Sequence, residues 1–268
     1  ENFPSALRSA MRADPDYKQR IRMAARNKSE LAAWLEGIWD IVAGGMVDDV
    51  WDRTMHCIEP FKIPVGWTID RAFDWGSSKP FALQWWAESD GSAAPNGKVY
   101  RKGSLFLIAQ WYGCTKKDNE GLRMLAVDIA REGLKREAEL TRMYGIRVQA
   151  GPADPSIFSK ENGNCIADDM ALVGMRFEPA DASKGSRKNG AERVRKYLEA
   201  AKKWPMEAPG LFVFNTTAHW LRTVPVIPRD LKDPDDVDTE SEDHDWDATR
   251  YRAMYKRQYM TTQKLVGV

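Results

Sequence analysis

The sequence contains few of the residues that bind zinc or carry thiol chemistry. It has 3 Cys and 3 His among 268 residues. Cys57, Cys114 and Cys165 lie far apart and form no CxxC or Cys/His ligand spacing, which argues against a structural zinc site and a dithiol redox motif. Scattered cysteines in odd number are typical of a reducing compartment, and a chain of this length buries enough surface to fold without disulfides.

Long apolar runs and targeting signals are also missing. No apolar run approaches the roughly 18 to 20 residues of a membrane span, and the N-terminus has neither the basic region nor the apolar region of a secretory signal. We therefore expect an intracellular, soluble protein with no membrane partner. Because the chain begins at Glu1 and not with methionine, we also expect an excised piece of a longer protein.

Charge is balanced in total but not along the chain. The net charge is +1, from 40 Lys and Arg against 39 Asp and Glu. Residues 230–247 contain ten acids and one base, a local charge of −9, which leaves +10 for the remainder. A basic body with one acidic segment is typical of proteins that bind nucleic acid, although a solvated acidic loop would give the same counts.

Apolar periodicity predicts two parts. Residues 1–50 read as a helical adaptor, since apolar residues recur three and four apart until Gly44 and Gly45 end the pattern. Residues 51–268 read as a second domain that opens with three strands joined by Gly, Ser, Pro and Asn turns, which indicates an antiparallel meander. The predicted strands are residues 68–75, 81–88 and 104–112.

The rest of this domain alternates helices and strands. The predicted elements are a helix at 119–144, strands at 146–150 and 175–178, a helix at 189–204, a strand at 211–214 and a helix at 245–258. Without the short strand at 175–178, the order is β-β-β-α-β-α-β-α. The fold class is therefore α/β, a mixed central sheet flanked by helices.

Two acids lie at or shortly after the ends of predicted strands. Asp74 ends the first strand in Phe73-Asp74-Trp75-Gly76, and Asp154 follows the strand at 146–150. Taken singly, each is typical of a turn residue or a helix cap. Adjacent strands would bring both into the crevice where α/β folds bind ligands, and two close carboxylates are tolerable if a divalent cation lies between them.

A third acid is available near the C-terminus. His244 and Asp247 are three residues apart at the start of the last predicted helix and share one face, whereas Asp245 points elsewhere. Helix capping by acids together with a disordered acidic linker explains residues 230–242 well. That combination does not explain a histidine at this spacing.

The segment Asp243-His244-Asp245-Trp246-Asp247-Ala248-Thr249-Arg250-Tyr251 resembles the D-H-x-x-D-A-x-R-Y signature of a known family. This family is the nuclease domain of the large terminase subunit of tailed bacteriophages, a member of the RNase H-like superfamily. Further matches are Phe73-Asp74-Trp75-Gly76, Ala153-Asp154-Pro155 and the helical lead-in at residues 34–40. The resemblance spans nearly the whole chain and implies an RNase H-like fold.

The resemblance also implies an activity. The chain would be a Mg²⁺- or Mn²⁺-dependent endonuclease that cleaves double-stranded DNA during viral genome packaging, with two divalent ions about 4 Å apart at the phosphate. Asp74, Asp154 and Asp247 would be the metal-binding acids, with Asp74 bridging both ions. His244 and Asp243 would be further candidate metal ligands, at positions that vary within the family, and His244 could instead orient a ligand.

The ATPase motor of large terminases is not visible in the sequence. No GxxxxGK[ST] phosphate loop occurs, and Trp75-Gly76-Ser77-Ser78-Lys79 lacks its spacing, so we expect no ATP site. The resemblance implies that residues 1–50 lead toward a missing motor domain of the same full-length chain. It further implies the small terminase subunit and the portal as partners, and a location in the host cell cytoplasm with transient attachment to the procapsid.

Double-stranded DNA would be held by the basic residues. Lys184, Arg187 and Lys188 lie in a predicted Gly/Ser loop, and Lys79 is close in sequence to Asp74. The bases at 193–196 fit a solvated helix face at least as well. His219, beside Trp220, is expected to be structural.

Two other functions stay open. One is another RNase H-like nuclease, of the resolvase or transposase type, which the D-H-x-x-D-A-x-R-Y match disfavours. The other is a catalytically idle module that docks to DNA or to the portal, because a fold alone does not establish activity.

Overall fold

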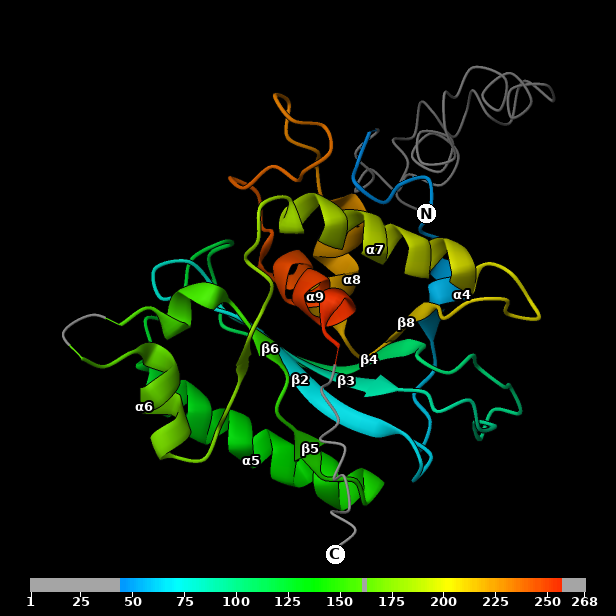
Figure 1. Ribbon diagram of the computed structural model, residues 1–268, viewed down its shortest axis with the longest axis horizontal. Helices are drawn as coiled ribbons and strands as arrows, with labels where there is room; N and C mark the ends of the chain where they lie inside the picture. The colour runs from blue at the N-terminus through cyan, green and yellow to red at the C-terminus, as the bar shows by residue number, and fades with distance from the viewer. Residues whose placement is uncertain (1–43, 161–162, 257–268) are drawn as a thin grey trace, which may run out of the picture.

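The computed structural model describes residues 44–160 and 163–256. Residues 1–43 of the predicted adaptor lie outside this range, so the adaptor at 1–50 stays a prediction. The described residues form one sheet between two layers of helices (Figure 1). No helix among them combines the length and the apolar character that crossing a bilayer needs.

The centre of the sheet is the predicted antiparallel meander. Its strands are β2 (Thr68–Asp74), β3 (Ala82–Glu88) and β4 (Leu105–Tyr112). Parallel strands extend it on both sides, which makes the sheet mixed, as predicted. They are β1 (Cys57–Ile58), β5 (Val148–Gln149), β6 (Pro152–Ala153), β7 (Glu178–Pro179) and β8 (Leu211–Phe214). The strand order is β1-β8-β4-β3-β2-β6-β7, and β5 pairs with β2 beside β6.

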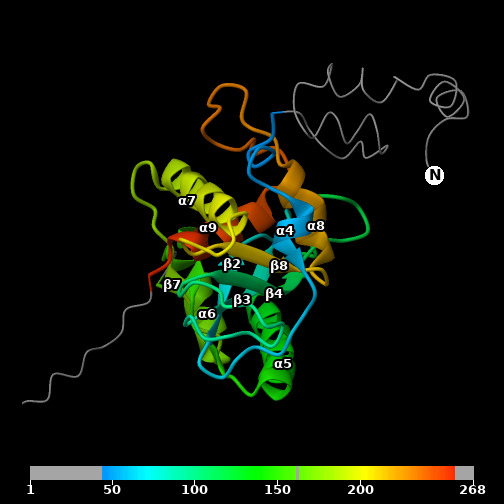
Figure 2. The same cartoon turned by 90° about the vertical axis from the view of Figure 1, so that its right-hand side faces the viewer.

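Helices cover both faces of the sheet (Figures 1 and 2). One face carries α5 (Ala126–Tyr144) and α6 (Ile166–Leu172), and the other carries α7 (Ser186–Ala201), α8 (Ala218–Thr223) and α9 (His244–Met254). The remaining elements are short: α4 (Arg53–His56), η1 (Pro155–Phe158) and η2 (Val224–Val226).

The two cores follow from strand alternation. In β4, Phe106 and Ile108 belong to the core that contains Ile129 of α5, whereas Leu105 and Leu107 belong to the core that contains residues of α7 and α9. Successive side chains of a strand point to opposite faces, so a strand buried on both faces reads as an unbroken apolar run. This explains why the sequence pattern located the meander closely.

Several predicted boundaries are wrong. The helix predicted at 119–144 begins at 126, because Gly121 packs against the 77–79 loop, where an added Cβ would lie 2.2 Å from the carbonyl oxygens of Ser77 and Lys79. Leu122 and Leu125, which continue the apolar pattern of this predicted helix, are 39% and 72% exposed.

Other elements shift by a few residues. The strand predicted at 146–150 is split into β5 and β6, and the strand predicted at 175–178 is β7, at 178–179. The helix predicted at 189–204 is α7, which begins at 186 and ends at 201, and the last helix begins at 244 and ends at 254.

Buried ion pairs hold β2 from both faces. On the α9 face, Arg252 Nε lies 2.6 Å from Asp70 Oδ1, and Arg252 Nη2 lies 2.7 Å from Glu88 Oε2. On the α5 face, Arg71 Nε lies 2.7 Å from Glu137 Oε1. The strand that ends in Asp74 is therefore tied to a helix on each side, although nothing local in the sequence predicted either pair.

Candidate functional site

Asp74 and Asp154 lie side by side at one edge of the sheet, as predicted. β2 and β6 are parallel with Phe73 opposite Ala153, and the Asp154 amide donates to the Phe73 carbonyl at 2.9 Å. Gly151 makes this approach possible, because a Cβ there would lie 2.0 Å from the Arg71 carbonyl oxygen. Asp74 and Asp154 are thus the residues that directly follow the opposed pair Phe73 and Ala153.

Helix α9 brings the C-terminal residues to the same edge. His244 Nδ1 lies 2.9 Å from Asp74 Oδ2, and the Tyr251 hydroxyl also hydrogen-bonds to Asp74. Asp245 is turned the other way, 1% exposed, and accepts from the side-chain amides of Gln84 and Gln110. The prediction that Asp245 lies on a different face from His244 is confirmed.

The acids at this edge disfavour one another's ionisation. Asp74 is 5% exposed, and burial raises its pKa well above the usual value, with Asp247 and Asp154 raising it further. Burial likewise raises the pKa of Asp243 to about 7, with a further contribution from Asp247. Burial lowers the pKa of His244, against the pull of Asp243 and Asp247. The site therefore concentrates negative charge that the protein compensates only in part.

Two arginines supply part of that compensation, and both contact Asp247. Arg187 Nη1 lies 3.2 Å from Asp247 Oδ2, and Arg250 reaches Oδ1 with Nε and Nη2, each at 3.1 Å. The Arg250 side chain crosses Gly190 of α7, where an added Cβ would lie 2.2 Å from its Cγ. Arg250 and Tyr251 belong to the signature segment, and their spacing of three and four residues from Asp247 is the signal that points to them.

The donor atoms suit a hard cation, but they are engaged with protein partners. Within the described ranges, no three His, Cys, Asp or Glu side chains are arranged to hold a metal ion. Asp154 Oδ1 caps η1 by accepting from the Ser156 amide at 2.9 Å, while His244 occupies Asp74 Oδ2 and the arginines occupy Asp247. Three crowded carboxylates fit the ligand chemistry of Mg²⁺ or Mn²⁺, and a bound ion would replace some of these contacts.

The predicted DNA-binding residues fall into two groups. Lys79 is exposed in the β2–β3 loop, and its charge lowers the pKa of His244, which places it beside the site. Lys184 is exposed just before α7. Neither lysine forms an ion pair with any residue of the described part of the chain.

The prediction of a loop for Arg187 and Lys188 is wrong. Both residues lie in the first turn of α7, where Arg187 pairs with Asp236 at 2.7 Å and Lys188 pairs with Asp233 at 2.8 Å. The acids come from residues 230–236, which the sequence could equally assign to a free linker. These two cations are therefore held by the chain's own carboxylates.

His219, which the sequence places beside the apolar Trp220, lies in a polar network and not on an apolar face. His219 Nδ1 lies 2.6 Å from Asp245 Oδ2, Nε2 lies 3.4 Å from Glu242, and the ring stacks on Tyr112 with centroids 3.4 Å apart. This network contacts α9 through Asp245, on the side of the helix that faces away from Asp74. His56 is buried and bonded to the backbone, as a structural histidine should be.

Comparisons with known proteins identify the fold. No protein-family model matches the chain, and no curated protein matches it in sequence. In structure, the chain is similar to the nuclease domain of the P22 large terminase, with a TM-score of 0.54, 20% identity and coverage of 79% of this chain and 93% of that one.

It is also similar to the large terminase of a thermophilic bacteriophage, solved in complex with ADP. Here the TM-score is 0.54 at 16% identity, and the match covers 89% of this chain and 51% of the other. The chain thus spans about half the length of that thermophilic phage protein. The chain has a mixed α/β fold similar to that of the P22 large terminase nuclease domain.

Proposed function

We propose that the chain is the nuclease domain of a phage large terminase subunit, a metal-dependent endonuclease that cleaves double-stranded DNA during genome packaging. The observation that carries this proposal is the placement of Asp74 and Asp154 at the ends of neighbouring parallel strands, with Asp247 of α9 close enough to raise the pKa of Asp74. The fold likeness supports it.

Asp74, Asp154 and Asp247 would hold two divalent ions, Mg²⁺ or Mn²⁺. When bound, the ions would activate water and offset the charge that develops on the phosphate. The rest of the site positions the ligands. His244 and Tyr251 fix the Asp74 carboxylate, and Arg250 fixes one oxygen of Asp247. Lys79, exposed beside the site, would contact the DNA backbone.

The test is cleavage of supercoiled plasmid in Mg²⁺, Mn²⁺ or EDTA. We expect nicking and linearisation with either metal, none in EDTA, and none with Asp74→Asn, which keeps the shape of the side chain. Glu207→Gln is the matched control, because Glu207 is exposed and pairs with no cation in the described part of the chain. Cleavage that persists in EDTA or in Asp74→Asn would contradict the proposal.

Metal binding can be measured without cleavage, as a change in Tm. Mn²⁺ should raise the Tm of the parent chain and of Glu207→Gln but not that of Asp74→Asn, since ligand binding to the folded state stabilises it. An equal shift in all three proteins would place the ion elsewhere.

A catalytically idle docking module is the second candidate. Two observations favour it. Guanidinium groups contact both carboxylate oxygens of Asp247. In the described residues, no three His, Cys, Asp or Glu side chains are arranged to hold a metal ion. It predicts DNA binding with no cleavage in either metal. The plasmid assay combined with a binding measurement separates the two functions.

The partners and location remain part of the proposal. We propose that an ATPase motor domain of the same full-length chain precedes the nuclease, because the thermophilic phage terminase is about twice as long as the matched region. The small terminase subunit, the portal and the host cytoplasm follow from the packaging role. Co-purification of the full-length chain with a portal protein would test this assembly.

A further inference from the structure

An acidic loop lies over the start of α7. We call residues 230–236 the acidic loop; it contains four aspartates (Asp230, Asp233, Asp235 and Asp236). Its base is fixed by an antiparallel bridge between Arg229 and Val237, and Val237 is buried. The loop projects above α7 at the top of the view in Figure 1.

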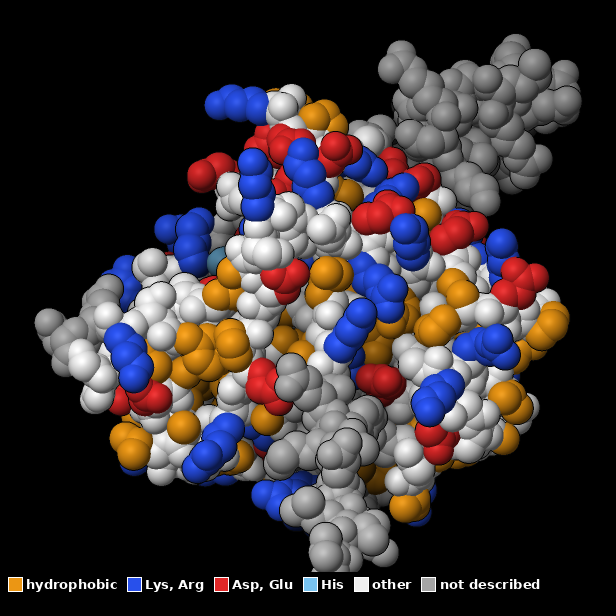
Figure 3. Space-filling view, in the orientation of Figure 1, with side chains coloured by type: hydrophobic (Ala, Val, Ile, Leu, Met, Phe, Trp, Pro, Cys, Tyr) orange, Lys and Arg blue, Asp and Glu red, His pale blue; other side chains and the backbone are white. Residues whose placement is uncertain are grey.

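The acidic loop contacts α7 through charges. Lys188 Nζ lies 2.8 Å from Asp233 Oδ1 and 3.7 Å from Asp235 Oδ2, and Arg187 Nε lies 2.7 Å from Asp236 Oδ2. All of these side chains are partly exposed to solvent, as the space-filling view of this face also shows for the charged groups around α7 (Figure 3). Salt screens such pairs, so the attachment is reversible under mild conditions.

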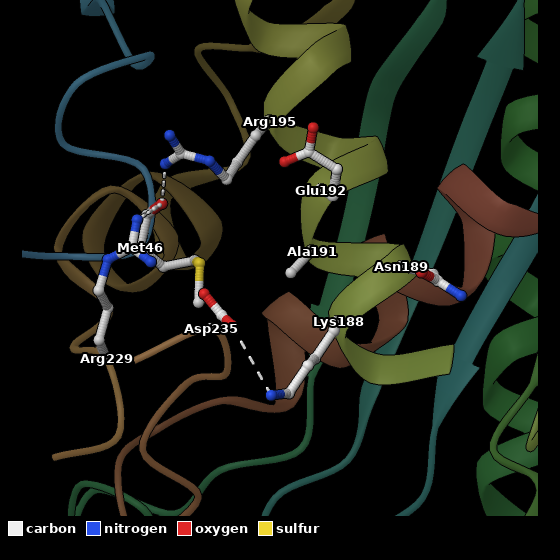
Figure 4. Close-up of a pocket in the computed structure, with 8 residues that line it drawn as sticks. All are labelled: Met46, Lys188, Asn189, Ala191, Glu192, Arg195, Arg229 and Asp235. Atoms are coloured by element: carbon white, nitrogen blue, oxygen red, sulfur yellow. Dashed lines mark hydrogen bonds and ion pairs between the residues drawn. The ribbon is translucent and has the colours of Figure 1, made fainter. Parts of the chain in front are cut away.

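A hollow separates the acidic loop from the middle of α7. A cavity of about 400 Å³ is lined by Met46, Lys188, Ala191, Arg195, Arg229 and Asp235, among others. Figure 4 shows Lys188 and Asp235 reaching toward each other at one end of this space, with Arg195 at the opposite end and Arg229 beside Met46. The loop is therefore anchored at its base and held on α7 by ion pairs at its rim.

The loop uses the same donors that a phosphate would use. Carboxylate and phosphate oxygens both accept charge-assisted hydrogen bonds from guanidinium and ammonium groups, so a side chain engaged with one is less available to the other. Arg187 also contacts Asp247, which links the loop to the candidate active site. A DNA strand approaching Asp247 along α7 meets cations already occupied by Asp233 and Asp236.

We propose that the acidic loop is an intramolecular competitor of DNA: it occupies Arg187 and Lys188 in the free protein, and the phosphate backbone of double-stranded DNA displaces it. This inference rests on the proposed function, because it takes α7 as part of the DNA surface. Displacement removes one of the carboxylates that hold Arg187 over the site and opens the α7 face to the duplex.

The test neutralises the loop without changing its shape. Asp233→Asn, Asp235→Asn and Asp236→Asn are combined in one variant. The control combines Glu139→Gln, Glu178→Gln and Glu207→Gln, three exposed acids that pair with no cation within residues 44–160 and 163–256. Both variants remove three negative charges, so a general charge effect acts equally on them. Circular dichroism and Tm verify that each variant folds.

Binding is measured by fluorescence anisotropy of a labelled duplex in EDTA, where metal-dependent cleavage cannot interfere. At about 50 mM salt we expect the loop variant to bind about tenfold more tightly than the control, since each exposed ion pair contributes a factor of about two to five. The advantage should shrink at about 300 mM salt, where the pairs are screened. Equal affinities for the loop variant and the control would overturn the loop proposal and leave DNA binding intact.

Two further measurements complete the test. Adding Arg187→Gln and Lys188→Gln to the loop variant should abolish its gain, and retention of the gain would overturn the proposal by placing the DNA elsewhere. In the parent chain, amide hydrogen exchange at residues 230–238 should become faster when DNA is added. Exchange that is unchanged or slower would also overturn the proposal. Failure of every protein to bind DNA would instead overturn the proposed function and this inference together.

Discussion

Ionisation of Asp243 should destabilise the folded chain, so its replacement by asparagine should stabilise the chain at neutral and alkaline pH. Asp243 is 8% exposed, and burial raises its pKa from 3.8 to about 7, with Asp247 adding to the rise. The residue precedes α9, but its carboxylate makes no capping hydrogen bond, so an amide loses none. The amide also mimics the protonated carboxyl that the site prefers.

Proton linkage gives the direction in which Asp243 changes the free energy of unfolding with pH. The folded state holds the Asp243 proton more tightly than the unfolded state, so the free energy of unfolding is unaffected below about pH 4 and falls as pH rises from there to about 7. One pKa unit corresponds to about 1.4 kcal/mol, and between about pH 5 and pH 8 the loss from Asp243 is about 2 to 3 kcal/mol. Asp243→Asn removes this loss.

The assay is urea unfolding followed by tryptophan fluorescence, in EDTA, at several values between about pH 5 and pH 8. The stability of the variant relative to the parent should increase progressively, by about 2 to 3 kcal/mol between about pH 5 and pH 8. A difference between parent and variant that stays constant over this range would refute the reasoning.

Asp49→Asn provides a control of opposite sign. The hydrogen bond from Arg195 lowers the pKa of Asp49, so its contribution is present above the unfolded pKa and is lost only as pH falls through the lower folded value. Because the Asp49 side chain is 56% exposed, the variant should be less stable by under about 1 kcal/mol, and by the same amount from pH 5 to pH 8.

Three substitutions probe the supports of the site. Gly190→Ala should cost about 1 to 3 kcal/mol in thermal unfolding and reduce plasmid cleavage, because the new Cβ displaces Arg250; unchanged cleavage would show that Arg250 is dispensable. Arg252→Met should cost about 3 to 5 kcal/mol in urea unfolding, since it takes the guanidinium from the buried Asp70; a loss below about 1 kcal/mol would contradict this. His244→Ala should slow cleavage about 10- to 100-fold in both metals, and parental rates would make His244 a structural residue only.

The placement of the acids of the candidate site could be predicted because each acid is marked by the sequence immediately around it. Asp74 ends a run of strand residues buried on both faces, and Asp154 is separated by three residues from the predicted strand at 146–150 and directly follows β6. Strand ends in a parallel pair share one edge, so two local patterns combine into one spatial prediction. The turn of His244 toward this edge follows from helical spacing in the same way.

The partners of the basic residues could not be predicted, because no local pattern encodes them. Arg187 is 49 residues from Asp236 and 60 from Asp247, and the pairs form only once α7 packs beside α9. The same holds for Arg252 and Asp70, 182 residues apart. Periodicity also misplaced the start of α5, since Leu122 and Leu125 continue a helical pattern that the close packing of Gly121 forbids.

The division of charge into a basic body and an acidic segment therefore does not measure the charge available to DNA. Acids of residues 230–247 pair with bases of the body: Asp233 with Lys188, Asp236 with Arg187, and Glu242 with Arg222. A cation engaged in this way must exchange a carboxylate for a phosphate, and that exchange is worth less than binding a phosphate with a free side chain. Affinity for DNA should thus depend on where the acids are held as much as on the net charge, which makes the acidic loop the element through which DNA binding is most easily changed.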